Sequence, residues 1–341
     1  MSKRFEPVSQ LDIAKALGIS QSTVSLALRG NDEVSEKTRR QVALKAKELG
    51  YVHNPKMGAL TSYRQTSSIK RVVPRLAWVT NFPTEKGWRK SHNLKYYNGA
   101  RRRAAELGFE LVEYWLSDVR VSKEKLQKEL TNLEISGLLF APQATLEAKI
   151  DLDLTAFSSV SIGGSLKSPI LHSVDSHAVG NVQQAVLNLR LRGYKRVGLA
   201  ACDSIDTRVD GAYSGGFLSV DDGGAIPPFM IEPFDHNSFG HWFRRWQPDA
   251  IVAWGDYLTR IESWLVGHGI EVGREIALAG LDLEDEKGKY AGIYQQSELI
   301  GEVAVETLVT YFNQFAYGVP EYAYQTLIDG RWVDGRSAPG K

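Results

Sequence analysis

The sequence predicts two kinds of structure in one chain: an all-α headpiece with a helix-turn-helix, followed by an α/β body of two doubly wound parallel-sheet lobes. Short helical segments with clear start and stop signals occupy the first fifty residues. From Arg75 onward, short apolar runs alternate with amphipathic stretches, which is the pattern of βαβ units. The charge divides at nearly the same place, because residues 1–72 carry thirteen Lys or Arg against six Asp or Glu and the rest is acidic.

The basic excess at one end indicates a small module that meets a polyanion, attached to a larger body that need not. On charge alone, a solubilising basic surface is the alternative. The chain has 341 residues, of which 43% are hydrophobic. That is enough for two or three domains, each with a core of its own.

Cysteine content and hydropathy exclude several classes of protein. Cys202 is the single cysteine, so neither a disulfide framework nor a cysteine-based zinc site is expected. No run approaches the roughly 20 apolar residues of a membrane span, and no apolar export segment follows the N-terminal Met-Ser-Lys-Arg. We therefore expect a cytoplasmic protein without a membrane partner.

Three short helices are expected in the first fifty residues. Capping residues precede them at Ser9, Ser20 and Ser35, and glycines close the first and the third at Gly18 and Gly50. Only two residues separate the first helix from the cap of the second, which is the tight connection of a helix-turn-helix unit.

The second helix, SQSTVSLALRG over residues 20–30, has two different faces. Val24 and Leu28 share the expected inward face at i, i+4. The opposite face carries Gln21, Ser22, Ser25 and Leu26. Small polar groups suit the edges of DNA bases, whereas the leucine either contacts a thymine methyl or packs in the three-helix core.

A short hinge helix and a linker are expected over residues 51–72. Asn54 can cap a helix of about two turns over residues 55–63, because Pro55 favours its first turn. Gly58 lies inside it, so the helix should be marginal alone. The polar, basic residues 64–71 are typical of a linker.

The body should contain parallel sheets with right-handed crossovers. The apolar runs expected as strands are residues 75–81, 109–116, 135–142, 160–164, 196–203, 249–256 and 276–282. The amphipathic stretches expected as helices are residues 93–108, 179–193, 257–269 and 298–312. A ligand of such a fold binds outside the carboxyl ends of the strands.

On these residues the chain resembles the LacI/GalR family of bacterial transcriptional repressors and activators. The resemblance is strongest in LDIAKALGISQSTVSLALRGNDEVSEKTRRQVALKAKELGYVHNP and continues more weakly through ISGLLF, LRGYKRVGLA, DAIVAWGD, IALAGLD and TLIDGRWVDG. It implies a homodimer whose two headpieces bind pseudo-palindromic double-stranded operator DNA. It also implies a body like a periplasmic sugar-binding protein, whose lobes enclose a small effector, expected to be a carbohydrate.

The expected domains follow from the resemblance. They are a helix-turn-helix domain at residues 1–50, a hinge helix and linker at 51–72, and an effector-binding and dimerisation domain at 73–341. The N-lobe is expected at about 73–164 and 292–320, and the C-lobe at about 165–291 and 321–341.

The resemblance also implies which residues contact DNA. Gln21 and Ser22 should make the specifying base contacts, and Leu60 should wedge into a minor-groove step. Leu26 stands where most relatives have an arginine that reads guanine, so the operator sequence does not carry over. The expected DNA-binding residues are Ser9, Ser20, Gln21, Ser22, Thr23, Ser25, Leu26, Asn54, Lys56 and Leu60, and the segment Lys37 to Arg40 adds candidate phosphate contacts.

Effector contacts are expected just after the apolar runs of the body. The expected residues are Asn81, Gln143, Arg208, Trp254, Asp256 and Asp282. The family motifs match Arg208 and Asp282, a guanidinium and a carboxylate that can together hold vicinal sugar hydroxyls. An interlobe or surface salt bridge is the alternative for Arg208, and a helix N-cap is the alternative for Asp256.

Two other functions are possible on the sequence alone. An enzyme is disfavoured: His172, Asp175 and His177 would alternate faces of a strand, GGSLKS lacks phosphate-loop spacing, and no nucleophile or zinc motif occurs. A free-standing sugar-binding protein would need an export signal and would have no use for a basic headpiece. We therefore expect a transcriptional regulator, with no cofactor, metal or catalytic residues.

Overall fold

The computed structural model describes residues 10–28, 34–49, 73–116, 123–145, 147–220 and 226–341. The chain divides into two compact units, Met1–Arg71 and Val72–Lys341, which are described separately below. Four of the expected DNA-binding residues, and the expected hinge helix, lie outside the described residues; the four are Ser9, Asn54, Lys56 and Leu60.

The headpiece contains three helices: α1 at Gln10–Leu17, α2 at Gln21–Leu28 and α3 at Glu36–Leu49. Gly18 joins α1 to α2 with a φ of 66°, in the left-handed region that favours glycine. Ser20 Oγ accepts a hydrogen bond from the Thr23 amide at 3.0 Å, and Ser35 Oγ accepts one from the Thr38 amide at 3.3 Å. The predicted caps at Ser20 and Ser35 and the helix-turn-helix are thereby confirmed.

The inward face of α2 differs from the expectation. Val24 is fully buried as expected, but its buried neighbour is Ala27 rather than Leu28. Leu26 and Leu28 are half-buried on either side of Ala27 and both pack against the headpiece core. Ala27 therefore belongs to the headpiece core, and the two longer leucines pack against that core from partly exposed positions.

The N-lobe of the body is built on a six-stranded sheet in the order β12-β7-β5-β3-β1-β2, in which all paired strands are parallel. Its strands are β1 Arg75–Thr80, β2 Glu110–Trp115, β3 Ile135–Phe140, β5 Ser158–Ile162, β7 His172–Ser176 and β12 Gln325–Ile328. A small separate pair joins β4 Ala148–Lys149 to β6 Leu166–Ser168. The carboxyl ends of the six strands therefore meet at one edge of the sheet.

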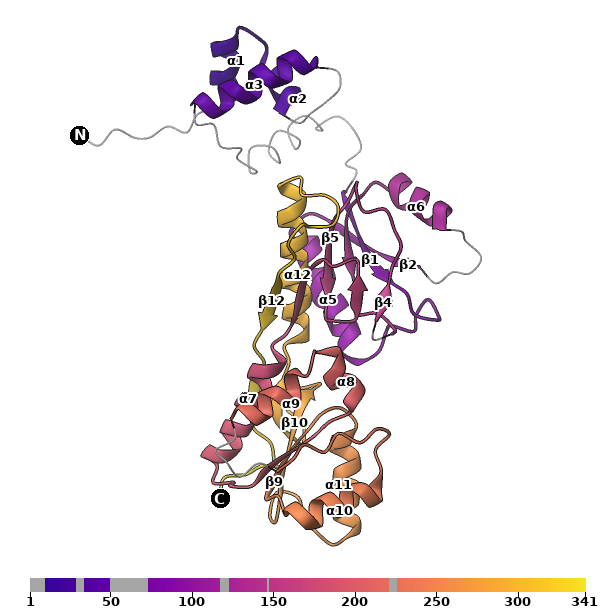
Figure 1. The fold of residues 1–341 in the computed structure, drawn as a ribbon, viewed down its shortest axis with the longest axis vertical. Helices are drawn as coiled ribbons and strands as arrows, with labels where there is room; N and C mark the ends of the chain where they lie inside the picture. The colour runs from indigo at the N-terminus through magenta and orange to yellow at the C-terminus, as the bar shows by residue number, and fades with distance from the viewer. Residues whose placement is uncertain (1–9, 29–33, 50–72, 117–122, 146, 221–225) are drawn as a thin grey trace, which may run out of the picture. The chain divides into compact units, whose positions relative to one another are not determined.

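Helices cover both faces of the N-lobe sheet, as Figure 1 shows. Leu76 and Trp78 of β1 pack on the face covered by α5, Ser91–Glu106, and α12, Ser297–Asn313. Ala77 and Val79 point to the opposite face, where Leu130 of α6, Lys123–Asn132, joins the core. Alternate strand residues are thus buried on both sides, which explains the nearly continuous apolar runs in the sequence.

The contact between α5 and α12 depends on two glycines. A Cβ on Gly99 would lie 2.0 Å from the carbonyl oxygen of Glu298, and a Cβ on Gly301 would lie 2.0 Å from that of Tyr96. Neither contact leaves room for a side chain, because the obstructing atom in each case belongs to the backbone of the other helix.

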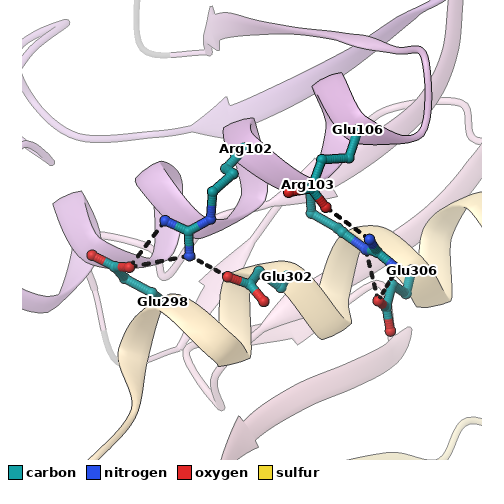
Figure 2. Close-up of polar contacts among 6 residues, drawn as sticks. All are labelled: Arg102, Arg103, Glu106, Glu298, Glu302 and Glu306. Atoms are coloured by element: carbon teal, nitrogen blue, oxygen red, sulfur yellow. Dashed lines mark hydrogen bonds and ion pairs between the residues drawn. The ribbon is translucent and has the colours of Figure 1, made fainter.

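Two arginines of α5 pair with glutamates along this helix contact (Figure 2). Arg102 donates to Glu298 at 3.2 Å and also pairs with Glu302. Arg103 donates to Glu306 of α12 and to Glu106 of its own helix, both at 2.7 Å. These groups remain substantially exposed, so they add less to the helix contact than the packing beneath them.

The C-lobe is built on a five-stranded sheet in the order β13-β11-β10-β9-β8, in which only β13 runs antiparallel to its neighbour. Its strands are β8 Val197–Ala200, β9 Ala250–Ala253, β10 Ala277–Leu283, β11 Ala291–Tyr294 and β13 Arg331–Val333. One face packs against α7 Ala178–Leu191 and α9 Ala212–Ser219, and the other packs against α10 His236–Trp246 and α11 Tyr257–Gly267. The short α8, Asp203–Arg208, follows β8.

The chain passes between the lobes three times, after β7, after β11 and after β12. Asn181 joins the first and third passages: its Nδ2 donates to Ser176 Oγ at 2.8 Å and its Oδ1 accepts from the Gly330 amide at 2.7 Å. Gln296, in the second passage, donates to the Asp329 carbonyl in the third at 2.8 Å. The three passages are therefore joined by hydrogen bonds into one connection.

The expected lobe boundaries were wrong in three places. The strands β7 and β12 fall within segments assigned to the C-lobe but pair in the N-lobe sheet, and most of β11 falls within an N-lobe segment but pairs in the C-lobe sheet. Each passage occurs after one of these strands. β7 reads HSVDS and β12 reads QTLI, so neither strand has the continuous apolar run that marked the others.

Candidate nucleic-acid interface and interlobe ligand site

The start of α2 presents an exposed polar surface. Gln21 and Ser22 are exposed, and Gln21 makes no side-chain hydrogen bond to another described residue. Ser20 Oγ lies 2.7 Å from both Ser22 Oγ and Thr23 Oγ1, so three hydroxyl groups gather at the helix N-terminus. The Gln21 amide can form paired hydrogen bonds to an adenine, and the hydroxyl groups can bond to bases or phosphates.

The remaining predicted contacts on α2 are less accessible. Thr23, Ser25 and Leu26 are half-buried, and Leu26 packs against the headpiece core with part of its side chain. At the start of α3, Lys37 is exposed, while Arg40 pairs with Glu36 at 2.9 Å. The exposed groups among the predicted contacts are therefore Ser20, Gln21, Ser22, Lys37 and Arg40.

In the body, a group of polar and aromatic side chains lies where the lobes meet. We call it the interlobe cluster; its members are Tyr96 of α5, Asp175 of β7, Arg208 of α8, Tyr213 of α9, Trp254 after β9 and Asp282 of β10. Burial raises the pKa of Tyr96, and the negative charges of Asp175 and Asp282 raise it further. Burial likewise raises the pKa of Tyr213, and the same two carboxylates add to the shift. Both tyrosines therefore remain neutral hydroxyl groups.

Asp175 occupies the N-lobe side of the cluster. Its Oδ1 accepts a hydrogen bond from the Ser176 amide at 2.7 Å, and both its carboxylate oxygens lie 4.0 Å from where a Cβ on Gly163 would be. Burial raises the pKa of this carboxyl to about 6, while the Ser176 amide and the Arg208 charge oppose the shift. Asp175 therefore titrates closer to neutrality than an ordinary aspartate does.

Arg208 faces Asp175 from the C-lobe. The turn after β5 reaches it, because a Cβ on Gly164 would lie only 2.8 Å from the Arg208 carbonyl oxygen. The Nε of Arg208 is buried and has no hydrogen-bond partner. A buried donor without a partner is rare in proteins and requires an explanation, such as a ligand that completes the site.

Trp254 and Gln143 also carry buried polar atoms without a partner. Gln143 Oε1 has none. Trp254 Nε1 lies beside the Tyr213 hydroxyl, whose pKa it lowers, but makes no hydrogen bond of normal geometry. The Gln143 side chain is held in place, because its Nε2 donates to the carbonyls of Ala141 and Val79 while its backbone amide donates to Ser165 Oγ at 2.7 Å. Its carbonyl oxygen is thus a fixed acceptor close to the turn that touches Arg208.

Asp282 connects the cluster to both lobes. Its Oδ1 accepts a hydrogen bond from the Gly255 amide at 2.9 Å. Its Oδ2 lies 3.7 Å from Nε2 of His92, at the start of α5. The other ring nitrogen of His92, Nδ1, lies 3.0 Å from Ser297 Oγ of α12. A chain of polar contacts therefore crosses from the C-lobe sheet to the two packed helices of the N-lobe.

Two of the expected effector-binding residues lie at the margin of this arrangement. Asn81 Oδ1 accepts from the Ala144 amide at 3.0 Å, which ties the side chain to its own lobe. Asp256 is exposed at the N-cap position of α11, makes no capping bond and pairs with Arg260 at 2.6 Å. The structure therefore places the Asp256 carboxylate against Arg260 rather than in the interlobe cluster.

The family model described as "Bacterial regulatory proteins, lacI family" matches residues 11–54. The helix-turn-helix headpiece of the chain therefore matches this family. Among curated proteins, it is 44% identical to the HTH-type transcriptional regulator GntR of Pseudomonas aeruginosa over 66 residues, 19% of each chain. It is 31% identical to DegA of Bacillus subtilis over 134 residues, 38% of this chain and 35% of DegA. These two matches thus span well under half of the relatives' length.

Matches that extend over most of the chain are weaker in identity. It is 23% identical to the ribose operon repressor of Escherichia coli K12 over 340 residues, 89% of this chain and 92% of that one. Its structure resembles the lac repressor dimer bound to operator and the anti-inducer ONPF, with a TM-score of 0.54 and 20% identity over 98% of this chain and all of that one. It also resembles a CelR–cellobiose complex, with a TM-score of 0.54 and 20% identity over 97% and 99% of the two chains. At this identity the structural matches show the fold.

Several members of the interlobe region were missed in the sequence. Sequence reasoning selected residues after strands, whereas His92, Tyr96 and Tyr213 are carried by helices. In the sequence, Asp175 stands out only beside His172 and His177, as a metal-like group of three residues. The alternation within HSVDS was the available signal, since it places Asp175 on the side of β7 opposite to the buried Val174.

A separate hollow of about 340 Å³ lies between α10 and α11, and shares no residue with the interlobe cluster. It is lined by His236, Asn237, Gly240, Arg244, Ser263, Trp264, Gly267 and His268.

In the described parts of the chain, no helix combines the length and apolarity needed to cross a membrane. Among those same residues, no three or more His, Cys, Asp or Glu side chains gather into a metal-binding group.

Proposed function

We propose that the chain is a homodimeric transcriptional regulator that binds operator DNA through its headpiece and responds to a small molecule held at the interlobe cluster. The observation that carries the ligand site is the set of buried polar atoms without partners, on Gln143, Arg208 and Trp254. The observation that carries DNA binding is the exposed polar start of α2 within a helix-turn-helix.

The headpiece supports sequence-specific binding in the major groove. A recognition helix reads base edges with the residues at its N-terminus, where Gln21 and Ser22 are exposed here. Basic groups such as Lys37 add contacts to phosphate that position the helix without specifying sequence. The names of the relatives agree with this role, since two are HTH-type transcriptional regulators and one is an operon repressor.

The interlobe cluster supports recognition of a polyhydroxylated molecule, which we propose to be a carbohydrate. Within the cluster, Arg208 and Trp254 offer donors, and Asp175 and Asp282 offer carboxylate oxygens. Beside the cluster, Gln143 offers an unused acceptor. A hydroxyl group both donates and accepts, so neighbouring hydroxyls of a sugar can satisfy both kinds of group. The cellobiose complex and the ribose operon repressor are consistent with a sugar.

Ligand binding can be coupled to DNA binding through the relative position of the lobes. The cluster takes residues from both lobes, so a ligand that binds them together favours one degree of closure. The three hydrogen-bonded passages restrict how the lobes can rotate. We propose that this change of closure sets the distance between the two headpieces of the dimer, and thereby operator affinity.

Selection of binding sites from random duplex DNA with the full-length protein tests the proposal. We expect a pseudo-palindromic sequence whose apparent affinity falls steeply between about 50 and 200 mM salt, because phosphate contacts release counterions. Repeating the measurement with ribose, cellobiose and other sugars should identify one that changes operator affinity. Sugar binding without any DNA binding would instead support a sugar-binding protein that has no regulatory role.

A further inference from the structure

We infer that the interlobe cluster selects an uncharged polyhydroxylated ligand and excludes its phosphorylated or otherwise anionic forms. The inference rests on the proposed role of this cluster as the effector site. It adds the charge class of the ligand, which neither the fold nor the family assignment provides.

The first step is the balance of charge in the described part of the site. Two carboxylates, Asp175 and Asp282, face one guanidinium, that of Arg208. His92 adds a positive charge only when it is protonated, and it already lies beside Asp282. Lys167 is outside the cluster, on an exposed pair with Asp210 at 3.5 Å. An anion entering the site would thus meet more negative than positive charge.

The second step concerns the unused hydrogen-bonding capacity of the carboxylates. Asp175 accepts one backbone bond, from Ser176, and Asp282 accepts one, from Gly255. The second oxygen of Asp282 is 3.7 Å from His92, beyond hydrogen-bond distance. Each carboxylate therefore keeps an oxygen that needs a donor, and hydroxyl groups of a ligand can supply donors.

The third step is the chemistry of the competing ligand. A phosphate ester brings oxygens that mainly accept hydrogen bonds, together with negative charge. Phosphate recognition commonly uses clustered arginines or an arginine or lysine free to pair with the phosphate. Here the site offers one guanidinium, that of Arg208, and its positive charge also acts on the Asp175 carboxylate. Like charges placed together in a desolvated site are a repulsive element that discriminates against the wrong ligand.

The fourth step is that the other polar groups of the site are neutral. Tyr96 and Tyr213 are buried and keep their protons, and Trp254 and Gln143 carry no charge. These groups can bond to hydroxyls, and none of them offsets the charge of an anion. The cluster as a whole therefore matches a neutral ligand with several hydroxyl groups.

The test is calorimetric titration of the full-length protein with matched pairs: ribose and ribose 5-phosphate, glucose and glucose 6-phosphate, and cellobiose beside its phosphorylated form. We expect at least one neutral sugar to bind, and its ester to bind at least about tenfold more weakly. Asp175→Asn and Asp282→Asn should each weaken binding of the neutral sugar. Each should also reduce the difference in affinity between the sugar and its phosphate ester. Asp256→Asn is the matched control, because that carboxylate is exposed and paired with Arg260, and it should change neither affinity.

Thermal unfolding of each variant separates a loss of folding from a loss of binding. An ester that binds as tightly as its sugar, or folded Asn variants that leave the ratio unchanged, would overturn the inference. Operator binding by a protein that binds no neutral member of the panel would also overturn it, and would leave the DNA-binding part of the proposed function intact. A neutral sugar that binds selectively but leaves operator affinity unchanged would support the inference and contradict only the proposed coupling.

Discussion

His92 Nε2 lies 3.7 Å from Asp282 Oδ2, and the two residues belong to different lobes of the body. Ser297 fixes the orientation of the histidine, since its Oγ lies 3.0 Å from the opposite ring nitrogen. Both side chains are largely buried, with 19% and 14% of their surfaces exposed. Because Asp282 is also a member of the interlobe cluster, any movement of one lobe against the other must change this contact.

A double-mutant cycle should detect this contact. His92→Ala and Asp282→Asn are expected to be non-additive in the free energy of unfolding, with a coupling of roughly 0.5–1 kcal/mol, because the pair is partly solvated and lies beyond hydrogen-bond distance. Denaturant unfolding of the wild type, the two single variants and the double variant measures it. His268→Ala combined with Asp282→Asn is the control, since His268 stacks on Trp264 of α11, and those two changes should be additive.

The raised pKa of Asp175 predicts a pH dependence of stability. The carboxyl has a pKa of about 6 in the folded protein and about 4 when unfolded. Between these values the folded state binds more protons, so the free energy of unfolding should decrease as pH rises through this window. Asp175→Asn should remove that part of the slope. Unfolding at several pH values between about 4 and 7 tests this, and an unchanged slope in the variant would contradict it.

The close contact of α5 with α12 predicts that an alanine at Gly99 strongly destabilises the body. Gly99→Ala should destabilise the body by at least about 1–3 kcal/mol, because its Cβ would meet the Glu298 carbonyl at 2.0 Å. Gly215→Ala is the matched control in α9, where nothing lies within 4 Å of the added Cβ. That change should stabilise the helix by roughly 0.5–1 kcal/mol. If both variants lost similar amounts of unfolding free energy, the close packing of α5 on α12 would not explain the effect of Gly99→Ala.

The ion pairs shown in Figure 2 should matter far less than the glycines beneath them. Arg102 is about half exposed, and its pairs with Glu298 and Glu302 are screened by solvent. We expect Arg102→Ala to cost less than about 1 kcal/mol in unfolding free energy, with a smaller effect at high salt. A loss as large as that of Gly99→Ala would show that charge pairing dominates the contact.

Two residues of α2 should separate headpiece stability from DNA recognition. Gln21→Ala is expected to weaken operator binding by roughly 1–3 kcal/mol while leaving unfolding nearly unchanged, because Gln21 is exposed. Leu26→Ala should destabilise the headpiece by about 1–2 kcal/mol, since the side chain packs partly against the core. Unfolding and operator titration of both variants distinguish these effects. A Leu26→Arg variant that shifts base preference at one symmetric pair of operator positions would show that this side chain also reaches the DNA.

The fold was predictable from the sequence where one physical signal dominated. The strands β1, β2, β3, β5, β8, β9 and β10 appear as apolar runs because both faces of each sheet are covered. The polar residues of β7 have separate partners: Asp175 belongs to the interlobe cluster, His172 stacks on Tyr311, and Ser176 Oγ accepts from Asn181. The passages between lobes could not be located, since hydrogen bonds such as those of Asn181 and Gln296 leave no periodic pattern.

The candidate ligand site was predictable in part for a similar reason. Parallel strands end at a common edge, so Gln143, Trp254 and Asp282 could be selected by position. Tyr96 and Tyr213 reach the same place from α5 and α9, and only the packing of those helices on the sheets brings them there. Asp256 follows a strand as the rule requires, but the nearby Arg260 on α11 engages its carboxylate.

The three passages between the lobes also constrain how the protein can be synthesised. The N-lobe sheet begins with β1 at residue 75 but is completed only by β12 at residues 325–328, and α12 covers one face of it from residue 297. A ribosome must therefore translate most of the C-lobe before the N-lobe can close its core. The C-lobe sheet likewise lacks its edge strand until β13, residues 331–333, has been synthesised. Neither sheet can therefore be completed during translation until residues 325–333 have been synthesised.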